Sequence, residues 1–227
     1  MGASDVFDAI QRGDLEGLQQ VLSRDPASAA KRNADGHSAL VVARYARRMD
    51  MVRMLLEVHP PLDVFEAAML GEIDRLRELL YESPDLASAW SADGFSALHL
   101  AASFGTPAAI EALLAAGSDP RAVSRNAMRL TPLHGAVTAG RHDIAKQLLD
   151  HGADPGTPQA GGFTPLHAAA RRGDLELVDL LIAHGADATR KSDDGRDAAA
   201  FAAENGHEAL AERLRRRSAM PLHRDPE

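Results

Sequence analysis

Three histidines occupy one recurring position, three residues after a serine or a threonine. The pairs are Ser96 and His99, Thr131 and His134, and Thr164 and His167. A row of imidazoles could bind a metal ion, and an imidazole beside a hydroxyl could activate that hydroxyl as a nucleophile. The spatial arrangement of the three pairs decides whether metal binding or nucleophilic catalysis is possible.

Neither chemistry fits pairs that repeat along a chain. If each pair belongs to one of several stacked helical units, neighbouring imidazoles lie roughly 10 Å apart, the spacing of packed helices. Zinc instead holds its ligands about 2 Å from one centre. A nucleophile needs a third orienting group and an oxyanion hole, whereas each pair here is local. The sequence also lacks the phosphate-binding, zinc-protease and hydrolase motifs, so we expect no catalytic residue, metal or cofactor.

The histidines belong to a longer phrase that repeats. Thr164-Pro165-Leu166-His167 follows Thr131-Pro132-Leu133-His134 by 33 residues. An earlier version is Ser96-Ala97-Leu98-His99, and a degenerate one is Asp197-Ala198-Ala199-Ala200. A period of 33 residues carrying T-P-L-H-x-A is the signature of ankyrin repeats, and the chain resembles that family over nearly its whole length. The resemblance implies that each histidine hydrogen-bonds its own hydroxyl residue and the neighbouring turn.

Apolar residues at spacings of three and four, interrupted by glycine, predict pairs of short amphipathic helices. We therefore expect an all-α ankyrin-repeat solenoid of about seven stacked helix-turn-helix units with β-turn fingers, the terminal units acting as caps. In this prediction, residues 1–217 form a single domain and residues 218–227 a loose C-terminal tail. The units run over about residues 5–34, 35–62, 63–92, 93–127, 128–160, 161–193 and 194–217. Fingers are expected near residues 35, 93, 128, 161 and 194. The shared core should contain Leu98, Leu113, Leu133, Leu148, Leu166 and Leu180.

The turn between the two helices of a unit carries a glycine that we expect at positive φ. These glycines are Gly13, Gly71, Gly105, Gly140, Gly173 and Gly206. Arg47 stands at this position in the second unit, where a side chain costs about 1 kcal/mol. His59-Pro60-Pro61 replaces the usual Gly-Ala-Asp, so the following unit should lack a finger. The 35 residues from Ser96 to Thr131 predict one lengthened finger.

The composition and charge of the chain exclude some classes of function. The formal charge of −8 argues against general affinity for nucleic acid. The basic run near Arg213 suits a solvated cap helix, since cations favour the last helical turn. The absence of cysteine excludes disulfides and thiolate chemistry but leaves the redox compartment undetermined. Residues 1–9 do not have the pattern of a signal peptide and no apolar run is long enough to span a membrane, so we expect a cytoplasmic protein. The alanine- and arginine-rich composition suggests a GC-rich bacterial genome.

Ankyrin proteins hold protein partners on the face formed by finger tips and exposed first-helix positions, and the resemblance implies the same use here. Aromatic, methionine and arginine side chains on that face are the candidate contacts. They are Tyr45, Met69, Phe95, Phe104, Met128, Arg129, Leu130, Phe163, Arg171 and Arg172. We expect a monomeric, non-catalytic scaffold or adaptor whose partner is another protein. The alternative is a regulatory, small-molecule-binding or enzymatic protein that uses the groove as a pocket. Replacing Phe95 and Phe163 by alanine should weaken partner binding with little loss of thermal stability.

Overall fold

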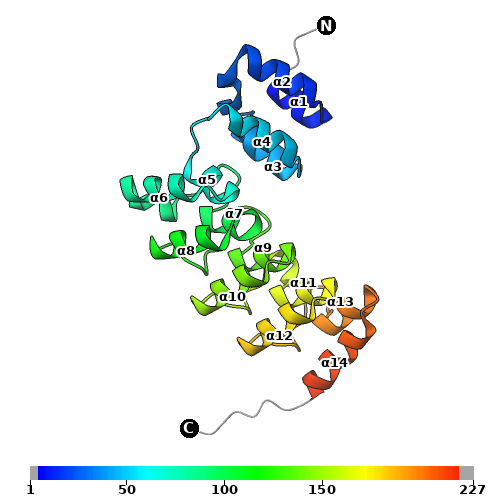
Figure 1. Cartoon of the computed structure of the whole chain (residues 1–227). Helices are drawn as coiled ribbons and strands as arrows, with labels where there is room; N and C mark the ends of the chain where they lie inside the picture. Colours follow the sequence, from blue (N-terminus) through cyan, green and yellow to red (C-terminus); the bar gives the residue numbers. More distant parts are fainter. Residues whose placement is uncertain (1–4, 220–227) are drawn as a thin grey trace. The chain divides into compact units, whose positions relative to one another are not determined.

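The computed structural model describes residues 5–219 as short helices joined by tight turns (Figure 1). Within that range there are fourteen α-helices, three short 3-10 helices and two isolated β-bridges, but no β-strand. The seven first helices are α1 (Val6–Arg12), α3 (Ala39–Tyr45), α5 (Val64–Leu70), α7 (Ala97–Phe104), α9 (Pro132–Ala139), α11 (Pro165–Arg172) and α13 (Ala198–Glu204). The second helices are α2 (Leu15–Arg24), α4 (Met49–Glu57), α6 (Ile73–Glu82), α8 (Pro107–Ala115), α10 (His142–Asp150), α12 (Leu175–Ala183) and α14 (Glu208–Ala219). The predicted all-α fold class is confirmed.

The chain divides into two compact units, residues 1–66 (unit 1) and residues 67–227 (unit 2), with the boundary inside α5. The number of repeats and the single domain over residues 1–217 stay predictions. Helix α14 continues to Ala219, two residues past the expected end of the last repeat. The rest of the predicted tail, residues 220–227, lies outside the described residues.

In unit 1, aspartates start the first helix pair. The carboxylate of Asp5 accepts from the Asp8 amide at 2.8 Å, and that of Asp14 accepts from the Gly17 amide at 2.8 Å. Each bond satisfies an amide that the first helical turn leaves free. A buried core of aliphatic side chains holds these helices together, and it includes Ile10, Leu18, Leu40 and Leu55.

In unit 2, the helices lie in two rows. The first helices α7, α9, α11 and α13 pack successively on one another, and so do the second helices α6, α8, α10 and α12 (Figure 1). Of the predicted core leucines, Leu98, Leu113, Leu133, Leu148 and Leu166 are buried. Leu180 is only half-buried, and Leu181 takes the core position instead. Leu181 is the core residue because it lies one repeat length, 33 residues, after the buried Leu148.

All five predicted fingers form, and each is closed by an equivalent backbone hydrogen bond. The amide-to-carbonyl pairs are Asn33 to His37, Ser91 to Phe95, Ser124 to Leu130, Gln159 to Phe163, and Ser192 to Arg196, at 2.7–2.9 Å. The Ser124–Leu130 bond spans six residues where the others span four, which confirms the lengthened finger. Successive fingers of unit 2 are also joined by backbone bonds, such as Ala160 N–H to Met128 O at 3.0 Å.

The turn prediction is right for most positions and wrong for Gly105. Arg47 has a φ of 58°, as expected for a residue in place of a turn glycine. Gly105 instead has φ −79° and ψ −149°. Pro107 forces the residue before it into an extended conformation, here Thr106 with ψ 159°, and the turn is rerouted. Glycine is needed there for close packing, since a Cβ would lie 2.4 Å from the Ala68 carbonyl oxygen.

Candidate protein-binding face

The three hydroxyl–histidine pairs start the first helices α7, α9 and α11. The imidazole Nδ1 atoms lie 2.8–2.9 Å from the hydroxyls of Ser96, Thr131 and Thr164. The Nε2 atoms reach carbonyls of the following turn, those of Leu130 at 2.9 Å, Phe163 at 3.2 Å and Arg190 at 3.0 Å. The contacts that the family resemblance implied are confirmed, and both ring nitrogens of each histidine are used within the stack.

These contacts specify the neutral imidazole. The Thr131 amide donates to His134 Nδ1 at 3.1 Å, so that nitrogen is an acceptor and the proton sits on Nε2, which donates to a carbonyl. Burial lowers the pKa of His99 and of His134 from 6.5 to about 4, despite the carbonyl contacts that oppose the shift. Burial also lowers the pKa of His167. The pairs therefore act as helix caps and carry no feature of a nucleophile–base site.

Among the ten predicted contact residues, Met69 does not reach the surface. Its side chain is 1% exposed and belongs to the core. The prediction counted back from the turn glycine, but the segment from Asp63 to Gly71 is one residue shorter than that from Ser96 to Gly105. Counted from the helix start, Met69 corresponds to Ala102, which is also buried.

A shallow pocket of about 180 Å³ brings two other predicted residues together, Phe163 from a finger and Arg171 from α11. Its remaining lining comes from α9, α11, α13 and the same finger, and includes Thr138, Gln159, Thr164, His167, Ala168 and Phe201. The rings of Phe163 and Phe201 are 5.2 Å apart and tilted, a favourable arrangement for an aromatic pair. Phe163 therefore packs on α13 of the next helix pair and still borders the pocket.

The two neighbouring arginines of α11 have different tasks. Arg172 donates from Nη1 to the Thr138 carbonyl at 3.1 Å and so satisfies the end of α9. Arg141 does the same for the Gly105 carbonyl at 2.6 Å. Arg171 is exposed and makes no hydrogen bond or ion pair with any residue that the structure describes. Arg171 is therefore the arginine of this pair that is available to a ligand.

The lengthened finger carries three predicted residues on its outer part. Met128 is 49% exposed, Arg129 is exposed with a φ of 53°, and Leu130 is half-buried. Phe95, on the preceding finger, and Phe104, the last residue of α7, are half-buried. Phe95 lies with its ring centroid 5.8 Å from that of His99. Of these five predicted residues, Met128 and Arg129 are thus the exposed ones.

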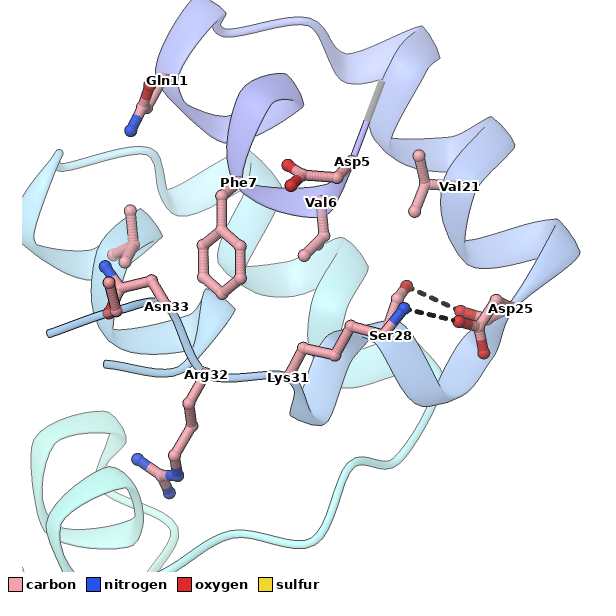
Figure 2. A pocket seen from close by; sticks show the side chains of 12 residues that line it. Asp5, Val6, Phe7, Gln11, Val21, Asp25, Ser28, Lys31, Arg32 and Asn33 are labelled. Carbon is pink, nitrogen blue, oxygen red and sulfur yellow. Dashed lines mark hydrogen bonds and ion pairs between the residues drawn. The ribbon is translucent and has the colours of Figure 1, made fainter. Parts of the chain in front are cut away.

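Tyr45 belongs to unit 1, where it is 36% exposed and contacts His37 edge-on at 5.7 Å. Unit 1 also contains the larger cavity, about 690 Å³, around Val6 and Phe7 (Figure 2). The cations at its edge are already paired: Lys31 with Asp25 at 2.9 Å and Arg32 with Asp63 at 2.7 Å. This cavity offers few of the unpaired convergent groups that small-molecule sites use.

Sequence reasoning missed Phe201 and Gln159. Phe201 lies 33 residues after Ala168, so the repeat places an aromatic ring where the preceding unit has a methyl group. That contrast was a usable signal. Gln159 has no such signal, because only the folded finger shows that its side chain lines the pocket.

A family model described as ankyrin repeats (3 copies) matches residues 64–159 and 154–225. These matches cover more than half of the chain, and the protein belongs to the ankyrin-repeat family. No helix in the described part of the chain is long and apolar enough to cross a membrane.

Several curated proteins share this region. The chain is 30% identical over 168 residues to a putative E3 ubiquitin-protein ligase of Arabidopsis thaliana, XBAT31, which covers 65% of this chain and 37% of that protein. It is 35% identical over 165 residues to the E3 ubiquitin-protein ligase KEG of the same plant, covering 63% and 10%. It is 47% identical over 55 residues to ankyrin repeat and SOCS box protein 16 of Mus musculus, covering 24% and 12%. The chain therefore spans well under half the length of these relatives.

Proposed function

We propose that this chain is a non-catalytic scaffold that holds another protein on the fingers and first helices of unit 2. The observation that carries the proposal is the pocket beside Phe163. Three of its side chains, Thr138, Gln159 and Arg171, can donate hydrogen bonds and make none to the described residues. The pocket thus combines an aromatic floor with unpaired donors, the composition of a protein-binding hot spot.

A non-catalytic role follows from how the candidate chemical groups are used. The hydroxyls and imidazoles that could have formed a nucleophile–base site are occupied as helix caps. The relatives named as E3 ubiquitin-protein ligases extend far beyond the matched region. We therefore assign no ligase chemistry to this chain, only the holding of a partner.

The mechanism we propose is display on a rigid framework. The first helices α7 and α9 are each joined to the next finger by a hydrogen bond between a histidine Nε2 and a backbone carbonyl. The fingers are joined to one another by backbone hydrogen bonds. A contact surface held in this way loses little conformational entropy when a partner binds. We expect a monomer, which light scattering at several protein concentrations will check.

The test compares two doubly substituted proteins as baits in pull-downs. Met128→Ala with Arg171→Ala changes the proposed face, while Tyr81→Ala with Arg77→Ala changes exposed residues of α6 in the second-helix row. Partners captured by the wild type should persist with the α6 variant and disappear with the first variant, while thermal melts show both proteins folded. Equal capture by all three proteins would count against the proposed face.

A further inference from the structure

Charge is sorted within unit 2. Residues 124–139 and 157–172, which form two fingers and the first helices α9 and α11, contain Arg125, Arg129, Arg171 and Arg172 but no aspartate or glutamate. The second helices α8, α10 and α12 show the opposite pattern. They carry Glu111, Asp143, Asp150, Glu176 and Asp179 against a single lysine, Lys146. A protein of net charge −8 therefore presents a cationic band on its finger and first-helix side.

None of the four arginines of this band forms an ion pair with an aspartate or glutamate among the described residues, although the charge of Arg172 helps to lower the pKa of the Asp174 carboxyl. Arg125 stacks over the Trp90 ring at 4.4 Å, and Arg172 donates to a carbonyl. Arg129 and Arg171 make no side-chain hydrogen bond or ion pair there. Elsewhere in unit 2 exposed cations are commonly paired, as Arg213 is with Asp179 and Lys146 with Asp150. Arg129 and Arg171 thus carry positive charge that no ion pair within the described residues neutralises.

The band has an apolar recess and a defined end. The pocket lined by Phe163, Ala168 and Phe201 opens beside Arg171. At the next finger the charge reverses, because Asp193 and Asp194 are exposed and Arg196 is engaged by Asp194 and Glu204. A ligand that matches these features is short, anionic on one side and bears an apolar side chain.

We propose that the partner segment of this scaffold is an acidic peptide in which carboxylates flank an apolar or aromatic residue. The apolar side chain occupies the pocket between Phe163 and Phe201, one carboxylate pairs with Arg171, and a further one pairs with Arg129. Gln159 and Thr138 donate to the peptide backbone. This inference rests on the proposed function and adds the chemistry of the partner. Nucleic acid fits less well, because the band is short and ends in carboxylates that would repel a longer polyanion.

The experiment selects ligands from random peptides displayed on phage, using the full chain as bait. Enriched peptides are then synthesised with a fluorescent label and titrated against three proteins: the wild type, Arg129→Glu with Arg171→Glu, and the control Arg77→Glu with Arg215→Glu. The control makes the same change of net charge on second helices at two exposed arginines. Arg172 is left unchanged because it holds the end of α9.

We expect enriched peptides rich in aspartate and glutamate around one apolar residue. Their binding should weaken at least about tenfold in the Arg129/Arg171 variant, change little in the control, and fall as salt is raised. Enriched peptides that compete for the face but show no acidic excess would overturn the acidic-peptide proposal alone. No enrichment, or equal binding by all three proteins, would overturn the proposed function as well. Binding of single-stranded RNA at physiological salt, lost in the Arg129/Arg171 variant, would replace the peptide by a nucleic acid.

Discussion

The same helix start is built from different chemistry in the two units. At the start of α5, within unit 1, the Asp63 carboxylate accepts from the Glu66 amide and the Glu66 carboxylate accepts from the Asp63 amide, both at 2.9 Å. Glu66 is 3% exposed and lies 3.4 Å from Arg32. In unit 2 the equivalent residues are a hydroxyl and a histidine, such as Thr131 and His134. One unit buries a carboxylate near a cation, and the other buries neutral imidazoles.

The fingers differ in a related way. The single finger of unit 1 is supported by a side chain, since Arg32 donates to the Gly36 carbonyl at 3.0 Å and reaches Asp63. The fingers of unit 2 support one another through backbone bonds, such as Asp193 N–H to Gly161 O at 2.9 Å. Backbone bonds leave the side chains of a finger uncommitted. Arg129 on a finger of unit 2 therefore remains available for a partner, whereas Arg32 does not.

The largest expected difference between the units is the effect of low pH on stability, because unit 2 buries neutral histidines. Burial lowers the pKa of His99 and of His134 from 6.5 to about 4, so between those values the unfolded chain binds protons that the folded chain does not. The contribution of each buried neutral imidazole to the free energy of unfolding is complete above pH 6.5. It falls by about 3 kcal/mol for each histidine as the pH drops toward 4. Chemical denaturation at several pH values measures the loss. A His134→Gln variant should lose less stability on acidification than the wild type, and an unchanged pH dependence would contradict the assignment.

Core truncation tests whether the two units unfold together. Leu133→Ala in unit 2 and Leu40→Ala in unit 1 each remove a fully buried side chain and should cost about 2–5 kcal/mol. Trp90, the one tryptophan of the chain, reports on unit 2 by fluorescence. If residues 1–217 unfold as one domain, as the sequence predicts, Leu40→Ala shifts the Trp90 transition too. If Leu40→Ala shifts the unfolding transition seen by circular dichroism but not the one seen by Trp90 fluorescence, the units unfold separately.

The repeat made the fold predictable, because one short phrase fixes the helix starts, the fingers and the histidine contacts together. The predictions failed where the spacing within a repeat changes, where the regular spacing was not followed, or where a nearby proline alters the backbone. Met69 was misplaced by a segment one residue short, and Leu180 was chosen where the repeat points to Leu181. Gly105 was misjudged because Pro107 acts on its neighbour. The pocket could not be predicted from the sequence for a different reason: it needs the packing of Phe163 on Phe201, which joins two successive helix pairs of unit 2.

That packing changes the expectation for Phe163. Since its ring contacts Phe201 at 5.2 Å, Phe163→Ala should lower the free energy of unfolding by about 1–3 kcal/mol as well as weaken binding. Tyr45→Ala in unit 1 removes a more exposed ring, which meets His37 edge-on, and should cost less. Denaturant titrations of the two variants give the comparison. Equal losses would show that the aromatic pair of unit 2 adds nothing to the stack.

The smallest effect concerns one turn that both units contain. Arg47 has φ 58° between α3 and α4, and Gly206 has φ 81° between α13 and α14. Arg47→Gly should raise the free energy of unfolding by about 1 kcal/mol, and Gly206→Ala should lower it by a similar amount. A Cβ at Gly206 would meet no atom within 4 Å, so Gly206→Ala measures the cost of the left-handed backbone conformation without any steric clash. If both substitutions are neutral in denaturant titrations, the left-handed turn carries no strain in either unit. A change only at Arg47 would mean that its side chain, and not the turn, sets the difference.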